Sequence, residues 1–264
     1  MATSTLSLSN ADLANDYEHL FDICRINPGK YQFVTNTISD IQGNETRYQN
    51  LGNRLGIPWY FIGIIHYMEA SLDFNCHLHN GDPLAARTVN VPFGRPADSN
   101  PPFTWEVSAA DALQLMKLDK WSDWSIPGIL FQFELYNGMG YRRRGINSPY
   151  VWSFSNNYSR GKFTSDGIFD PNAVSKQCGA GVLLRRMKEL QLITDPTTDR
   201  IATIKNLGSQ VAYSGAYSDK AEQLQILLNS VGATLRVDGE AGDKTSQAYK
   251  NISGNYLTGD PRIH

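Results

Sequence analysis

Glu69 has the position and the neighbours that suit a general acid. It follows an apolar run over residues 59–68 that reads as a helix, and the C-terminal end of a helix disfavours a negative charge. Burial beside Trp59, Tyr67 and Met68 disfavours the charged form further. Both effects raise the pKa of a carboxyl group toward neutrality, as general acid catalysis requires. The alternative is a helix-end glutamate that extends into solvent.

A polar segment follows Glu69 directly and could line a cleft that holds a water molecule or a sugar. Its polar members are Ser71, Asp73, Asn75, His77, His79, Asn80 and Asp82. Two histidines and a carboxylate are weak evidence for zinc, and no third strong ligand stands nearby. We therefore expect hydrogen bonding in this loop and no metal site.

Other reaction types lack their motifs. The chain contains no G-x-S-x-G, and no cysteine has a sequence context that suggests activation. It also contains no P-loop and no G-x-G-x-x-G. We expect no cofactor.

A second group of sugar-binding residue types lies between residues 134 and 152. Aromatic faces stack on pyranose rings, and Asn or Arg side chains bind hydroxyl, N-acetyl or carboxylate groups. The candidates are Tyr136, Asn137, Tyr141, Tyr150 and Trp152, together with the run 142–144 of three arginines. The alternatives are core packing for about half of the aromatic residues and a solvated face for the arginines. The arginines would also suit an anionic polymer such as a bacterial cell wall.

Hydrophobic periodicity and capping residues predict the helices that must position these groups. The expected helices cover residues 12–24, 31–55 with a break near Gly43, 58–69, 108–121 with Ser108 as N-cap, 126–138 and 174–192. The helix over 58–69 has no polar face before His66, so we expect it to be buried on nearly all sides. Residues 82–95 suit a short hairpin or an extended loop, and residues 195–199 read as a linker.

Composition agrees with one large and one small folded domain, mainly α-helical. The chain has 264 residues, of which 41% are hydrophobic and 11% aromatic, and this excludes disorder as the dominant state. A net charge of -2 gives no general attraction to nucleic acid or to an anionic membrane. No apolar stretch is long enough to cross a membrane, so we expect no membrane insertion.

Three cysteines, Cys24, Cys76 and Cys178, cannot all pair, and we expect reduced thiols. The first fifteen residues have no basic or apolar region of the secretory type. We therefore expect synthesis in the cytoplasm, with export by a membrane-permeabilising partner or by phage-like delivery. We also expect a monomer.

Several motifs resemble the lysozyme superfamily over roughly residues 12–192. The run 65–71, IHYMEAS, resembles the helix that ends in Glu-Ser in lysozymes and soluble lytic transglycosylases. The run 133–141, FELYNGMGY, is similar to the A-Y-N-G motif of the goose-type branch, and residues 77–84 and 148–153 look like phage- and bacteria-encoded lysozyme family proteins.

This resemblance implies a helical lysozyme-like domain over residues 1–195 with a small β-hairpin wall. It implies cleavage of the β-1,4 bond between N-acetylmuramic acid and N-acetylglucosamine, with Glu69 as the acid. The spacing suits Asp82, or a residue at Arg87 or Thr88, as the second catalytic group. His79, Thr88 and Glu134, which replaces the small residue expected before Tyr-Asn, are further candidate substrate contacts. Hydrolysis and transglycosylation both remain open, since the separation of the carboxylates decides stereochemistry at about 5–5.5 Å or about 6.5–9.5 Å.

The tail resembles a helical peptidoglycan-binding domain, which we place at residues 196–264. Residues 223–232 carry its L-Q..L-N..G helix and residues 237–248 its D-G..G..T..A turn. Gly239 and Gly242 permit positive φ angles, and Asp243 or Thr245 can cap the next helix. The family's last helix is replaced by residues 255–262, so a domain that only stabilises the larger one is the alternative.

The sequence thus favours an endolysin-like enzyme whose partner is bacterial peptidoglycan. A chitin- or chitosan-cleaving glycosidase is a related alternative. A wall-binding or virion structural protein without turnover is the alternative from another functional class, and burial of an intact Glu69 argues against it.

Overall fold

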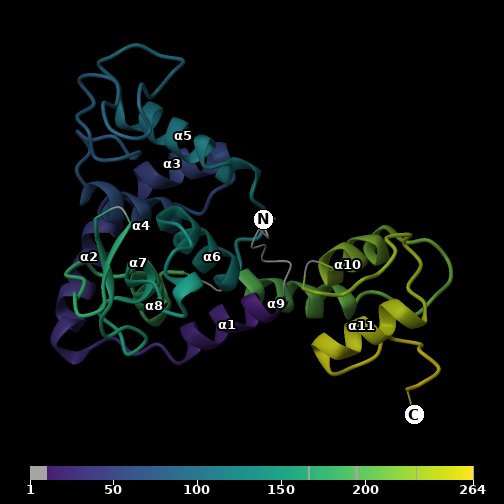
Figure 1. Ribbon diagram of the computed structural model, residues 1–264. Helices are drawn as coiled ribbons and strands as arrows, with labels where there is room; N and C mark the ends of the chain where they lie inside the picture. The colour runs from purple at the N-terminus through teal and green to yellow at the C-terminus, as the bar shows by residue number, and fades with distance from the viewer. Residues whose placement is uncertain (1–10, 166, 194–195, 230, 264) are drawn as a thin grey trace, which may run out of the picture. The chain divides into compact units, whose positions relative to one another are not determined.

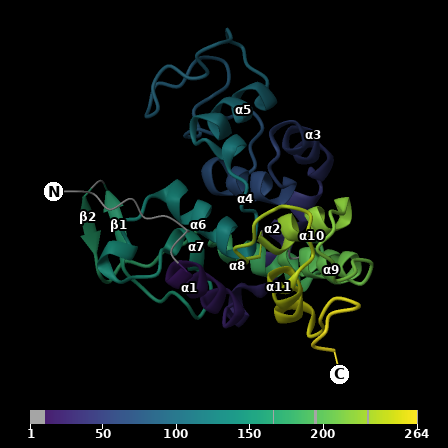
Figure 2. The same cartoon turned by 90° about the vertical axis from the view of Figure 1, so that its right-hand side faces the viewer.

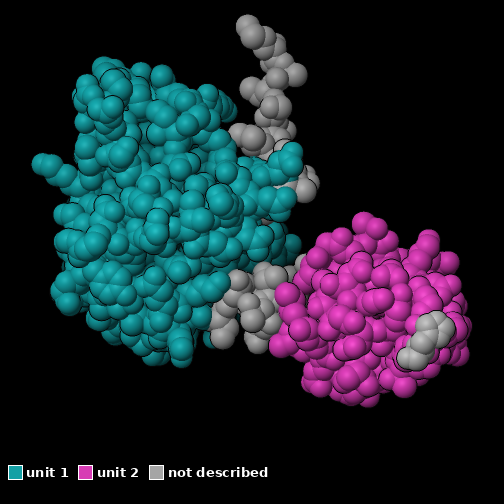
Figure 3. All heavy atoms as spheres, turned by 90° about the horizontal axis from the view of Figure 1, so that it is seen from below, with its two compact units in different colours: residues 1–193 teal, residues 194–264 magenta. Residues whose placement is uncertain are grey.

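The computed structural model describes residues 11–165, 167–193, 196–229 and 231–263. Their contacts divide the chain into two compact units, unit 1 at residues 1–193 and unit 2 at residues 194–264 (Figure 3). The described residues form eleven α-helices and one two-stranded antiparallel sheet. The prediction of a mainly helical chain is therefore confirmed.

Unit 1 holds eight of these helices and the sheet (Figure 1). The helices are α1 Ala11–Asp22, α2 Tyr31–Gln42, α3 Glu45–Leu55, α4 Trp59–Ala70, α5 Trp105–Leu115, α6 Ile126–Asn137, α7 Pro149–Trp152 and α8 Ala180–Glu189. Short 3-10 turns cover Pro28–Lys30, Leu118–Lys120 and Arg142–Arg144. The sheet pairs β1 Lys162–Ser165 with β2 Ile168–Asp170 and lies at the edge of the unit in Figure 2.

Helix α4 lies in the core of unit 1, as its lack of a polar face predicts. It packs against α2, α3 and α8, and its residues from Tyr60 to His66 are buried. The rings of Phe61 on α4 and Phe133 on α6 stack with centroids 4.9 Å apart. Each such side chain contributes about 1.5–3 kcal/mol when fully buried. This packing fixes both ends of α4, including the end that carries Glu69.

Two helix starts differ by three or more residues from the sequence prediction, and α5 also ends at Leu115 instead of residue 121. Helix α5 begins at Trp105, because Thr104 accepts a hydrogen bond from the Val107 N–H at 3.3 Å and is the N-cap. Ser108, the predicted cap, lies inside the helix. Helix α8 begins at Ala180 instead of residue 174, after Gly179 passes so close to Val151 that a Cβ would lie 2.4 Å from its carbonyl oxygen.

For the segment 82–95 the sequence predicts a short hairpin or an extended loop, and the structure shows an extended loop. The β-hairpin that the lysozyme resemblance implies for this region is not there, and the described strands lie at residues 162–170. Helices α2 and α3 confirm the break that Gly43 predicts.

Unit 2 contains α9 Pro196–Gly208, α10 Asp219–Asn229 and α11 Asp243–Ser253. Its core includes Ile204, Leu224, Leu228, Tyr249 and Leu257. The predicted linker at 195–199 is wrong from Pro196 onward, because proline suits the first turn of a helix. Residue 195 lies outside the described residues.

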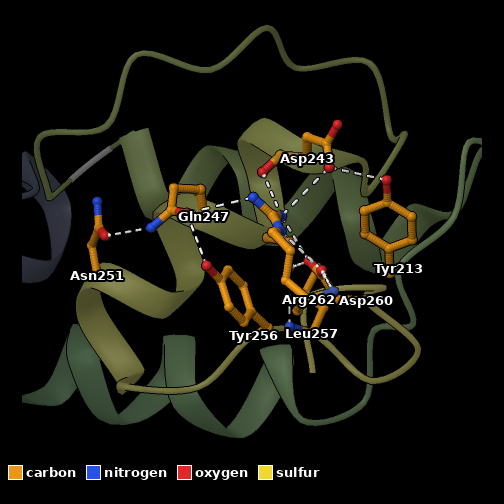
Figure 4. A network of polar contacts seen from close by, with 9 residues as sticks. Tyr213, Asp243, Gln247, Asn251, Tyr256, Leu257, Asp260 and Arg262 are labelled. Atoms are coloured by element: carbon orange, nitrogen blue, oxygen red, sulfur yellow. Dashed lines mark hydrogen bonds and ion pairs between the residues drawn. The ribbon is translucent and has the colours of Figure 1, made fainter. Parts of the chain in front are cut away.

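The segment after α11 is non-helical and is held by a polar network (Figure 4). Arg262 donates to Asp260 Oδ2 at 2.7 Å, and the Ser246 hydroxyl donates to the same carboxylate. Tyr213 donates to Asp243 at 3.1 Å. The bond from Ser246 to Asp260 fastens residues 255–262 to α11, where the resemblance implies a further helix. Among the described helices of both units, none combines the length and apolarity that a membrane crossing requires.

Candidate functional site

The chain turns sharply just after Glu69. Ser71 and Leu72 both adopt left-handed conformations, with φ angles of 51° and 65°. The Ser71 N–H donates to the Tyr67 carbonyl at 3.1 Å and the Leu72 N–H to the His66 carbonyl at 3.3 Å. Two consecutive non-glycine residues at positive φ cost on the order of 1 kcal/mol each, and such strain is concentrated at functional sites.

The Glu69 carboxyl group lies against two tyrosines from other helices. Tyr150 of α7 donates a hydrogen bond to Glu69 Oε1 at 2.6 Å. Burial raises the pKa of Glu69 above its usual range, and the bond from Tyr150 offsets this in part. Burial and the charge of Glu69 also raise the pKa values of Tyr136 and Tyr150. The group therefore keeps its proton to higher pH than an ordinary glutamic acid.

Tyr136 connects this site to the polar loop that follows α4. Its hydroxyl lies 3.4 Å from the carbonyl oxygen of Leu78. At the same loop, Gly81 lies next to the main chain of Glu69, where a Cβ would come within 3.4 Å of the Glu69 carbonyl oxygen. The end of α4, the end of α6, α7 and the loop thus meet around one carboxyl group.

His66 stabilises the turn after Glu69 through hydrogen bonds. Its Nε2 donates to the Asp73 carbonyl at 3.2 Å, and its Nδ1 accepts from the Tyr48 hydroxyl at 2.9 Å. Burial lowers the pKa of His66 to about 4. Phe74 and Trp105 pack around the ring. A neutral imidazole therefore ties the turn after Glu69 to the core.

A second support comes from the segment before α8. The Gln177 side chain donates to the Met68 carbonyl at 2.7 Å, next to Glu69 in sequence. The backbone N–H of Cys178 donates to the Tyr67 hydroxyl, whose pKa burial raises to about 12. Sequence reasoning missed Gln177, because no local pattern marks a residue that reaches a helix end more than a hundred positions away.

The carboxylate of Asp82, the predicted second catalytic group, accepts hydrogen bonds from its own loop. Its carboxylate accepts from the N–H groups of Asn90 at 3.1 Å and Val89 at 2.8 Å. The side chains of Asn90 and Asn80 donate as well, at 2.7 and 3.0 Å. These bonds, led by the Asn90 N–H, hold the pKa of Asp82 below its usual range. The observed role of Asp82 is to shape residues 82–90.

His79 and Thr88, predicted substrate contacts, make internal bonds instead. The His79 side chain is 1% exposed, and its Nε2 donates to Asp111 Oδ2 at 2.7 Å. Arg95 pairs with the same carboxylate. The Thr88 hydroxyl donates to the Pro92 carbonyl and accepts from the Arg95 N–H. His79 thus holds the loop against α5 and Thr88 bonds within the loop, while the buried Nδ1 of His79 has no hydrogen-bond partner.

Glu134 and Tyr141 also face other parts of unit 1. Glu134 is 2% exposed and bonds with the Tyr17 hydroxyl and with Arg142, whose Nε lies 3.0 Å away. The Tyr141 hydroxyl accepts from the Phe163 N–H at 3.0 Å and so holds β1. Both side chains therefore have hydrogen-bond partners within unit 1.

Trp152 and Asn137 have opposite environments. Trp152 is 1% exposed and lies in the core, so its faces are covered by protein and are not offered to a sugar ring. Asn137 is exposed at the end of α6. Of the ten predicted site residues, the structure brings Glu69, Tyr136 and Tyr150 together.

Comparison of the chain with protein-family models, with curated proteins and with solved structures finds no match. In the described part of the chain, no three His, Cys, Asp or Glu side chains are grouped so that they could hold a metal ion. The chemistry of the site therefore rests on the geometry of its own residues, which offer a proton donor at Glu69.

Proposed function

We propose that unit 1 is a peptidoglycan glycosidase in which Glu69 is the general acid. The single observation that carries this proposal is the half-buried carboxyl group at the end of α4, whose pKa is raised and whose Oε1 accepts a hydrogen bond from the Tyr150 hydroxyl at 2.6 Å. Glycosidases need an acid whose pKa lies above that of an ordinary carboxyl group, and burial shifts the pKa of Glu69 in that direction.

In the proposed reaction, Glu69 gives its proton to the glycosidic oxygen as the bond from that oxygen to the anomeric carbon breaks. The anomeric carbon then bonds either to the oxygen of a water molecule or to the C6 hydroxyl of its own sugar, and the proton released returns to the Glu69 carboxylate. The carboxylate that forms keeps the hydrogen bond from Tyr150, which is stronger to a charged acceptor than to a neutral one. Tyr150 thereby favours the state in which the proton has left. Tyr136 and the neighbouring loop supply the polar and aromatic surroundings of the sugar.

Asp82 has a supporting role in this proposal. Its four donors stabilise the carboxylate, so it remains ionised and is a weak proton acceptor. We assign it to shaping the loop beside Glu69 and to electrostatic support. The ends of the released sugars distinguish the two forms of the reaction: a reducing end indicates hydrolysis and a 1,6-anhydro end indicates transglycosylation.

Unit 2 is proposed as a peptidoglycan-binding domain that brings unit 1 to the wall. The support is its sequence resemblance and the way its motif residues fold. Gln225 of the L-Q motif accepts from the Asp238 and Gly239 N–H groups at 3.0 and 2.8 Å. The helix and the turn of the motif are therefore one connected structure.

The decisive test is Glu69→Gln assayed on purified peptidoglycan, with released fragments identified by mass spectrometry. We expect turnover to fall by about 10²–10⁴ while the fold is kept. Glu18→Gln, an exposed glutamate on α1, is the matched control and should keep full activity. A folded Glu69→Gln protein with wild-type turnover would refute the proposal. Retention on insoluble peptidoglycan with no fragments from the wild type would indicate a binding protein.

A further inference from the structure

A hollow of about 580 Å³ lies on unit 1 beside the segments that frame Glu69. Its lining includes Lys30, Phe154, Tyr158, Ser159, Val174 and Lys176, and we call it the lysine hollow. None of the described residues that line it carries a carboxylate. The whole chain has a net charge of -2. The two ammonium groups at this hollow therefore give it a positive charge that the chain as a whole does not have.

The backbone around Phe154, at the base of the hollow, is held by several contacts. Phe154 adopts a φ angle of 75°, which is rare for a bulky residue and persists only where its surroundings impose it. Its carbonyl accepts from the Asn27 N–H at 2.9 Å, and Ile26 forms a β-bridge with Ser155. Lys30 lies over the Phe154 ring, with Nζ 4.6 Å from the centroid.

The charge around Lys30 favours an anion. Lys30 is the N-cap residue of α2, and the first turn of that helix has no acidic residue. The N-terminal end of a helix carries a partial positive charge, which adds to that of the ammonium group. The exposed Val174 supplies an apolar surface beside these charges, and the largely buried rings of Phe154 and Tyr158 lie beneath it. Such a hollow suits a carboxylate on a short, partly apolar chain.

Two segments join the lysine hollow to the candidate site. Phe154 lies four residues after Tyr150, the partner of Glu69. Lys176 precedes Gln177, whose side chain donates to the Met68 carbonyl at 2.7 Å. The Gln177 N–H in turn donates to Ser175 Oγ at 3.3 Å. The segments that carry Phe154 and Lys176 therefore belong to the same framework that positions Glu69.

We propose that the lysine hollow binds the carboxylates of the peptide stems of peptidoglycan. This inference rests on the proposed function, since the peptide stem is the part of peptidoglycan that a site for the glycan strand does not bind. Glycan strands carry short peptides rich in alanine and in carboxylates, which match an apolar floor with two cations. The hollow would favour strands with intact stems over bare strands.

Binding is tested directly by NMR titration of the full chain with the stem tripeptide L-alanyl-γ-D-glutamyl-diaminopimelate. We expect shifts at Phe154 and Val174, and roughly tenfold weaker binding in the double variant Lys30→Met, Lys176→Met. A Lys30→Arg, Lys176→Arg variant should retain binding. The matched control is Lys120→Met with Lys220→Met, which removes the same charge elsewhere.

Three results would overturn the inference: shifts elsewhere, equal affinity in the Lys30→Met, Lys176→Met variant, or equal affinity for the fully amidated tripeptide. Inorganic phosphate that binds the hollow more tightly than the tripeptide would assign it to phosphate polymers instead.

A turnover assay separates this inference from the proposed function. On peptidoglycan with stems, the Lys30→Met, Lys176→Met variant should lose about tenfold in kcat/KM, and on strands stripped by an amidase it should match the wild type. An equal loss on both substrates would contradict stem recognition while leaving Glu69 as the acid. Wild-type inactivity on both substrates, with lysine-dependent tripeptide binding, would refute the glycosidase and leave the binding site.

Discussion

The Tyr150 hydroxyl donates to Glu69 Oε1 at 2.6 Å, and this bond opposes the effect that burial has on the same carboxyl group. Burial raises the pKa of Glu69, and the bond from Tyr150 lowers it because the donor stabilises the charged form. The two effects act on different states of a reaction. Burial favours the acid before proton transfer, whereas Tyr150 favours the carboxylate after it.

Tyr150→Phe removes the donor and keeps the ring. The pKa of Glu69 should rise further, so the alkaline limb of the pH–rate profile should move to higher pH. Turnover at neutral pH should fall by about tenfold, because the product carboxylate loses a charge-assisted bond of about 1.5–3 kcal/mol. The measurement is kcat/KM on purified peptidoglycan from pH 4 to 9. Tyr217→Phe in unit 2 is the control, and an unmoved alkaline limb in Tyr150→Phe would refute this role.

Glu69→Gln should make unit 1 more stable at neutral pH while it abolishes turnover. The folded pKa of Glu69 lies above its unfolded value, so folding binds a proton between the two. The stability that the group contributes is thus complete below about pH 4.5 and is lost as the pH rises through the folded pKa. Glutamine has no charge to lose. Thermal unfolding at pH 5 and pH 8 should show a smaller fall in Tm for Glu69→Gln than for the wild type, and equal falls would contradict the burial of this charge.

His66 should make the fold sensitive to acid. Its folded pKa of about 4 lies below the ordinary histidine value of 6.5, so the unfolded chain binds the proton first as pH falls. The contribution of the neutral imidazole is complete above about pH 6.5 and is lost as the pH falls through 4. The difference corresponds to about 3 kcal/mol in the free energy of unfolding. NMR titration of the His66 ring, together with urea unfolding at pH 7 and pH 4.5, checks this, and a ring that titrates near pH 6.5 would disprove it.

Asp82→Asn separates loop shaping from catalysis. An amide cannot accept at both ends of the group, so at least one of the donors at Val89, Asn90 and Asn80 loses its partner. We expect a loss of about 1–2 kcal/mol in stability and faster hydrogen exchange at the Val89 and Asn90 amides. Turnover should fall much less than in Glu69→Gln, with the acidic limb of the pH profile retained. Loss of that limb with unchanged exchange would instead identify Asp82 as a catalytic base.

Apolar pattern was enough to predict α4 and its burial, because a run without a polar face can only be covered by other elements. The same pattern indicates Glu69 as a candidate acid, since this residue directly follows the apolar run. Tyr136 and Tyr150 were predicted from their type, and the structure brings both to the carboxyl group. Their agreement depends on the packing of α6 and α7, which the local sequence does not contain.

Asp82 and Trp152 show where residue type misleads. A carboxylate in a polar loop fits an acid–base role, but its backbone donors come from residues seven and eight positions ahead in a turn that has no simple pattern. Trp152 lies two residues from Tyr150, and only the packing of α7 decides which ring enters the core. Ser108 failed as a cap because Thr104 offers an equivalent hydroxyl four residues earlier. In each case, the deciding contact is tertiary or lies just outside the local sequence pattern.

Glu134→Gln tests the corrected position of that residue. Glu134 is 2% exposed on α6, accepts from Tyr17 of α1 and pairs with Arg142, which also bonds Asp16 Oδ2 at 2.8 Å. Removing the buried carboxylate leaves Arg142 with one partner, and breaking such a pair costs about 3 kcal/mol. Urea unfolding should show this loss, with turnover per folded molecule close to wild type. Asp16→Asn is the control at the more exposed end of the pair, with a loss below about 1 kcal/mol. A fall in kcat without a fall in stability would instead place Glu134 in the chemistry, because loss of its ion pair with Arg142 must lower stability.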